Sequence, residues 1–191
     1  MYPFNREAAF SYATRWAYGR NPQFYDFGSL GGDCTNFASQ CLYAGCGVMN
    51  YTPETGWYYI DLNNRAPAWT GVPFLYSFLT TNEGPGPIAQ LSPLYIAEAG
   101  DIIQLQNENG RLYHSLVVLA NTGNDILVAS HSDDSLFRPL STYNYNNAYL
   151  LHILAQALSP GCRSGWFSLA SLRYAFLISS ALAPFCRPST S

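Results

Sequence analysis

The sequence predicts an α+β fold in which a few helices pack on one antiparallel sheet. Helical spacing of apolar residues dominates the first half of the chain, and short apolar runs separated by turn residues begin near residue 100. Of the 191 residues, 48% are hydrophobic and only 11% are charged. A chain of this size can bury about 70% of its unfolded surface. These values predict one folded domain and exclude a disordered or coiled-coil protein.

Two helices are predicted near the N-terminus. Apolar residues recur at helical spacing over residues 5–19, and Asn5 is suited to cap the first turn. Residues 33–44 show a second helical pattern, which Gly45 and Gly47 are expected to end.

The hydrophobic period changes in the second half of the chain. A shorter amphipathic helix is predicted over residues 71–81, before a break rich in glycine and proline. Beyond it, the separators Asn-Glu-Asn-Gly and Asn-Thr-Gly-Asn are typical of hairpin turns, so the runs form an antiparallel meander. Strands are expected over residues 101–105, 112–120, 125–130 and 148–154.

The last part of the chain differs from the rest in composition. We predict a domain over residues 1–154 and an apolar tail over residues 155–191. Residues 166–183 reach only the short limit for a membrane span, and Arg173 lies near their centre. We therefore expect a loosely packed tail or a non-native extension rather than a transmembrane helix, and no membrane partner.

Charge and cysteine usage exclude several classes of partner. The net charge is −3, and the nine basic residues are scattered arginines that form no basic stripe, so we expect no nucleic acid partner. The five cysteines include no C-x-x-C pair, and no nucleotide-binding glycine motif is present. We therefore expect no metal and no cofactor. The N-terminus has no secretory signal pattern, which predicts a cytoplasmic protein unless the chain is a piece of an exported one.

The sharpest local signal is the segment Gly31-Gly32-Asp33-Cys34-Thr35-Asn36-Phe37. Asp33 is suited to the N-cap position, which places Cys34 in the first turn of a helix. There the unpaired amides and the positive end of the helix dipole favour a thiolate, which is the nucleophilic form of cysteine. The alternative is that Cys34 is a small buried hydrophobic residue, as most free cysteines are.

A nucleophilic cysteine needs a base, and His114 opens a central strand where it can serve as one. His131 ends the next strand. If the hairpin pairs regularly about Gly123, His114 and His131 are near neighbours, and His131 can orient His114. Asp133 is the competing orienting residue. We expect His152, in the last strand, to be structural.

These residues resemble the bacterial putative amidase domain family over roughly residues 3–154. The block Gly32-Asp33-Cys34-Thr35-Asn36-Phe37-Ala38-Ser39-Gln40 is that family's hallmark. The family is similar in layout to the NlpC-type and CHAP-type cell-wall hydrolases, which are papain-like cysteine hydrolases. The resemblance therefore implies a papain-like arrangement of helices on an antiparallel sheet.

The resemblance also implies roles for individual residues. Cys34 matches the nucleophile, His114 the base, and His131 the third member on the following strand. The residues expected to support the site or its oxyanion are Asp33, Tyr12 and Tyr25.

The implied activity is hydrolysis of an amide bond through an acyl-enzyme on Cys34. The implied substrates are amides or peptides, with the peptides of peptidoglycan favoured. Two alternatives stay open: an inactive module that binds glycan or peptide, and an acyltransferase in which an amine replaces water. The sequence makes no prediction of oligomeric state.

Overall fold

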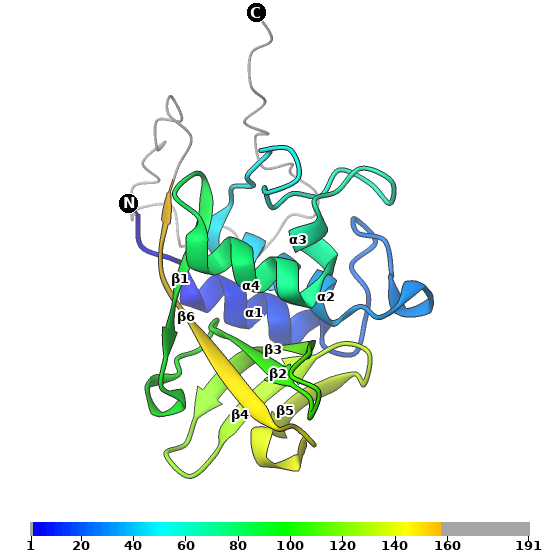
Figure 1. The fold of residues 1–191 in the computed structure, drawn as a ribbon. Coiled ribbons are helices and arrows are strands. Elements are labelled where there is room, and N and C mark those ends of the chain that lie inside the picture. Colours follow the sequence, from blue (N-terminus) through cyan, green and yellow to red (C-terminus); the bar gives the residue numbers. More distant parts are fainter. Residues whose placement is uncertain (1, 158–191) are drawn as a thin grey trace, which may run out of the picture. The chain divides into compact units, whose positions relative to one another are not determined.

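The computed structural model describes residues 2–157, which form a mixed α+β unit built on one six-stranded antiparallel sheet. The strand order is β1-β6-β2-β3-β4-β5. Helices α1, α2 and α4 lie together on one face of this sheet (Figure 1). The α+β class and the antiparallel sheet predicted from the sequence are therefore confirmed.

The helices form close to where the apolar periodicity predicts them. Asn5 caps the first one, since its side chain accepts a hydrogen bond from the amide of Ala8 at 3.0 Å. Gly45 lies inside the second helix, which ends instead at Gly47 in a left-handed conformation. The four helices are α1 (Arg6–Trp16), α2 (Cys34–Cys46), α3 (Pro67–Thr70) and α4 (Val72–Thr81).

Two of the six strands were not predicted from the sequence, namely β1 and β5. The strand β1 begins with glycine and proline, and β5 has only one buried residue, so neither shows a clear period of two. The strands are β1 (Gly86–Ser92), β2 (Ile102–Gln106), β3 (Leu112–Asn121), β4 (Ile126–Ser130), β5 (Ser135–Pro139) and β6 (Asn147–Ala157).

Strand β6 pairs with both β1 and β2 and extends three residues past the expected end of the domain at residue 154. Residues 158–191 lie outside the described part of the chain. The expectations for the tail, including the apolar segment 166–183, therefore concern residues that the structure does not describe.

Apolar side chains pack on both faces of the sheet. The larger core lies between the helices and the sheet, where Val117 and Ala129 contribute from β3 and β4. The smaller core lies on the opposite face and contains Leu116 and Val128 from the same strands. Because successive residues of a strand face opposite sides, the parity of a position decides which core it meets.

A buried carboxylate fastens helix α1 to the adjacent strands β2 and β6. Asp101, which is fully buried, accepts hydrogen bonds from Arg6 at 2.7 Å, from His152 at 2.8 Å and from the amide of Ile153 at 2.9 Å. Arg6 also pairs with the exposed Glu98 at 2.9 Å. His152 therefore has a structural environment, away from Cys34 and His114.

We expect Asp101→Ala to lower the free energy of unfolding by about 3 to 5 kcal/mol, because it leaves Arg6 and His152 without their buried partner. Glu98→Ala is the matched control. It removes an exposed partner of the same arginine and should cost less than about 1 kcal/mol. Urea unfolding of both variants measures the difference, and equal costs would contradict this account of Asp101.

Candidate active site

Helix α2 begins at Cys34, so the thiol lies in the first turn as the sequence predicts. The preceding Gly31 and Gly32 have φ values of +112° and +117°, in a region that favours glycine. A Cβ atom at Gly32 would also lie 3.2 Å from the Oγ of Ser132. The two glycines thus allow the chain to turn tightly into the helix beside the segment that follows β4.

Asp33 occupies the N-cap position, but its carboxylate does not cap the helix amides. Its Oδ1 accepts hydrogen bonds from the amide of Phe27 at 2.9 Å and from the side chain of Asn36 at 2.8 Å. Its Oδ2 lies 2.5 Å from Nδ1 of His131. Asp33 therefore connects the loop before α2, the first turn of α2 and the segment after β4.

Both ring nitrogens of His131 have a polar partner. Its Nε2 lies 2.9 Å from the carbonyl oxygen of Trp16, which can only accept, so Nε2 carries a hydrogen. Its Nδ1 faces the Asp33 carboxylate, whose other oxygen already accepts two hydrogen bonds. His131 and Asp33 therefore form a buried, hydrogen-bonded imidazole–carboxyl pair. The ring also stacks on Phe37, with centroids 4.0 Å apart.

This placement differs from the predicted role of His131 as the group that orients His114. The β3–β4 pairing matches Val117 with Ala129, and its continuation sets position 131 opposite position 115 rather than 114. An offset of one residue turns side chains to opposite faces of a sheet. His114 lies on the same face of the sheet as Leu116 of the smaller core, two positions further along β3. His131 instead faces the helices, where its ring stacks on Phe37.

A buried hydrogen bond links the neighbours of the two predicted catalytic residues. Thr35 follows Cys34, Ser115 follows His114, and their hydroxyl oxygens lie 3.1 Å apart. The side chain of Gln104 donates to Ser115 at 3.2 Å and continues this contact into β2. The start of α2 is thereby held against the start of β3.

Cys34 and His114 line the same cavity, which has a volume of about 650 Å³. Within residues 2–157 no hydrogen bond joins their side chains, a separation common in ligand-free active sites. The β2–β3 ladder carries a bulge directly beside His114, a feature that re-aims side chains at strand ends. The other lining residues are Arg20, Asp26, Gly28, Gly31, Gly32, Tyr113, Ser132, Asp133, Arg138, Tyr143 and Asn144.

Burial, rather than the helix dipole, dominates the electrostatics of Cys34. It raises the pKa of the thiol, and hydrogen bonds from the backbone of Ser115 and from Thr35 oppose it only in part. The charge of Asp33 raises the pKa further. Burial of Cys34 therefore opposes the thiolate that its position at the start of the helix favours.

His114 is neutral in the resting site. Burial lowers its pKa to about 4, the charge of Asp133 opposes this shift, and the guanidinium of Arg138 adds to it. The imidazole can therefore accept a proton at neutral pH. Asp133 is the carboxylate that acts on His114, and it lines the cavity, which His131 does not.

The two tyrosines expected to support the oxyanion do not line the cavity. Tyr12 donates to Gln40 at 2.6 Å in the helical layer, and burial raises its pKa. The half-exposed ring of Tyr25 packs against Phe27.

The tyrosines that do line the cavity are Tyr113 and Tyr143, whose rings flank His114 at centroid distances of 6.1 and 5.9 Å. Tyr113 donates to the carbonyl of Asn144 at 2.6 Å and so closes one side of the cavity. Its place directly before His114 is the one sequence signal that could have identified it. Tyr143 carries no such signal.

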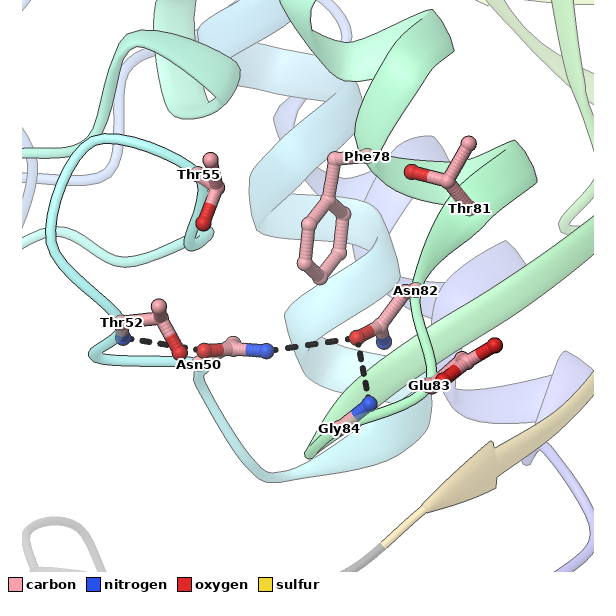
Figure 2. Close-up of a pocket in the computed structure, with 8 residues that line it drawn as sticks. All are labelled: Asn50, Thr52, Thr55, Phe78, Thr81, Asn82, Glu83 and Gly84. Carbon is pink, nitrogen blue, oxygen red and sulfur yellow. Dashed lines mark hydrogen bonds between the residues drawn. The ribbon is translucent and has the colours of Figure 1, made fainter.

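A second cavity, of about 290 Å³, lies between the loop after α2 and the end of α4 (Figure 2). Its amide side chains bind one another, since Asn50 donates to Asn82 at 3.3 Å. Asn82 in turn accepts from the amide of Gly84 at 2.9 Å. None of the predicted catalytic residues lines this cavity.

Within residues 2–157, no group of three or more His, Cys, Asp or Glu side chains is arranged to hold a metal ion. In the same part of the chain, every helix is too short or too polar to cross a membrane. The three cysteines described, Cys34, Cys41 and Cys46, are buried and free.

Comparison with known proteins identifies the class to which this fold and site belong. Residues 3–154 match the family described as "Putative amidase domain", and the chain is a member of that family. A stretch of 152 residues is 30% identical to the "Uncharacterized protein YhbB" of Bacillus subtilis (strain 168), covering 78% of this chain and 47% of that protein. The chain thus spans about half the length of this curated relative. No solved structure matches the chain.

The buried state of His114 predicts a pH dependence of stability. The unfolded chain binds a proton at this histidine near pH 6.5, whereas the folded protein does so only near pH 4. Stability should therefore fall as the pH drops from 6.5 to 4, by up to about 3 kcal/mol from this group. Urea unfolding at pH 7 and pH 4 should show a smaller loss for His114→Gln than for the wild type, and an equal loss would refute the assignment.

Proposed function

We propose that this protein is a cysteine amidase or peptidase that hydrolyses an amide bond through an acyl-enzyme on Cys34. One observation carries the proposal: Cys34, at the start of α2, and His114, at the start of β3, line one cavity. The hydrogen bond between Thr35 and Ser115 holds these two segments together. A thiol that shares a cavity with an imidazole that is neutral at pH 7 supplies the two groups that nucleophilic catalysis needs.

The proposed reaction starts from the neutral pair. The Sγ atom of Cys34 attacks the carbonyl carbon of the amide while His114 takes the thiol proton. The tetrahedral intermediate expels the amine, which receives that proton, and leaves a thioester on Cys34. A water molecule, deprotonated by His114, then attacks the thioester and releases the carboxylic acid and the free thiol.

Two further groups support this reaction. The amide of Cys34 is among those that a helix leaves without an intrahelical partner, so it can donate to the developing oxyanion. Asp133 favours the protonated form of His114, which exists only while the reaction proceeds. We therefore assign to Asp133 the supporting role that the sequence also offered to His131.

The proposed substrates are cell-wall peptides, a class implied by the resemblance to cell-wall hydrolases. Purified peptidoglycan incubated with the wild type should release fragments that mass spectrometry identifies as products of amide cleavage. A parallel incubation with other peptides and amides tests the wider class. Release of an amine adduct of the acyl group, rather than the acid, would make the protein an acyltransferase.

Cys34→Ala should reduce turnover by a factor on the order of 10³ or more, because it removes the nucleophile. Its free energy of unfolding should change by less than about 1 kcal/mol. Cys46→Ala, at the other end of the same helix, is the matched control and should retain activity. Substantial turnover by a folded Cys34→Ala variant would end the cysteine mechanism.

Asp133→Ala and His131→Ala should separate a catalytic effect from a structural one. Asp133→Ala should slow turnover about fivefold, the rate equivalent of the ~1 kcal/mol typical of an exposed charge interaction, with little loss of stability. His131→Ala leaves the Asp33 carboxylate buried without its partner and should cost about 3 to 5 kcal/mol. Activity assays and urea unfolding distinguish the two, and the reverse pattern would exchange these roles.

A further inference from the structure

We propose that Arg138 forms a carboxylate-binding subsite in the active-site cavity, so that the preferred amide substrate carries a negative charge close to the bond that is cleaved. The inference deepens the proposed function and rests on it for the reaction. The binding of an anion at Arg138 can be tested without any turnover.

The first observation is the pairing of the two guanidinium groups that line the cavity. Arg20 is surrounded by carboxylates, with Asp134 at 2.9 Å, Asp26 at 3.4 Å and Asp33 at 3.6 Å. Arg138 has no carboxylate within 4 Å among residues 2–157. The charge of Arg138 is therefore left for a ligand, whereas that of Arg20 is compensated within the protein.

The second observation is that the guanidinium of Arg138 is held in a fixed orientation. Its Nε donates to the hydroxyl of Thr142 at 3.0 Å, and its Nη2 donates to the carbonyl of the same residue at 3.2 Å. The group lies over the ring of Tyr143, 3.9 Å from the centroid. No partner within the described residues accepts from its Nη1. An arginine ordered in this way loses little entropy when it binds a carboxylate.

The third observation places Arg138 beside the chemistry. Two charged side chains act on His114: the carboxylate of Asp133 raises the pKa of the imidazole, and the guanidinium of Arg138 lowers it. A substrate carboxylate bound at Arg138 offsets this charge and so favours the imidazolium that forms during the reaction. Asp26 and Asp133 also line the cavity, so the affinity for an anion is confined to the neighbourhood of Arg138.

Binding to the full-length Cys34→Ala protein tests the proposal. The probes are fluorescein-labelled pentapeptides, Ala-Ala-Glu-Ala-Ala and Ala-Ala-Gln-Ala-Ala, each with a free or an amidated C-terminus. Fluorescence polarisation at low salt gives the four affinities. These four probes distinguish a side-chain carboxylate from a terminal one.

We expect at least one acidic probe to bind about tenfold more tightly than its uncharged counterpart. Adding Arg138→Gln should abolish this preference. The affinity for the uncharged probe, which has glutamine and an amidated C-terminus, should stay within about twofold of its value without that substitution. Adding Arg138→Lys, which keeps the charge but not the planar fork, should retain part of the preference. Arg111→Gln, at an exposed turn outside the cavity, is the matched control and should change nothing.

The outcomes separate this inference from the proposed function. Three results would overturn the subsite: equal binding of the acidic probes and their uncharged counterparts, absence of binding, or a preference for acidic probes that survives Arg138→Gln. Wild-type protein that prefers acidic probes through Arg138 but cleaves no amide retains the subsite and refutes the amidase. Amide cleavage without a preference for acidic probes retains the amidase and refutes the subsite.

Discussion

The buried carboxylate of Asp33 is the constraint on which the geometry of the site depends. A charge removed from water is stable only when its oxygens are paired, so Asp33 fixes every group that it contacts. These groups come from the loop before α2, from α2 itself and from the segment after β4, where His131 supplies a ring nitrogen as partner. Cys34 is the next residue, and its position follows from this pairing.

The site divides into a buried floor and a charged rim. Cys34 and His114 are only 7% and 9% exposed, and burial raises the pKa of the thiol and lowers that of the imidazole. Of the charged groups that line the cavity, Asp133 raises the pKa of the imidazole and Arg138 lowers it. Proton transfer from the Cys34 thiol to the His114 imidazole creates a thiolate and an imidazolium. In a site of low dielectric constant, these charges need a bound substrate to stabilise them.

Sequence patterns predicted the elements with strong local signals and missed those without them. The helices α1, α2 and α4 show an apolar period of 3.6, and α2 begins at Cys34 as the glycine and aspartate before it indicate. The edge strands β1 and β5 were missed because β1 begins with glycine and proline and β5 has only one buried residue, so neither shows a clear period of two. The third site residue depended on which face each strand residue meets, and an offset of one position moved His131 into the helical layer.

The sequence by itself determined the family, the α+β class, and the positions of the candidate nucleophile and base, since each follows from residues close together in the chain. Only the tertiary structure decided that burial raises the pKa of Cys34, that His131 pairs with Asp33, and that tyrosines 113 and 143 flank the base. Protonation and pairing depend on burial and on the charges that surround a group. Those surroundings come from segments far away in the chain, since Asp33 and His131 are 98 positions apart and Trp16 and His131 are 115 apart.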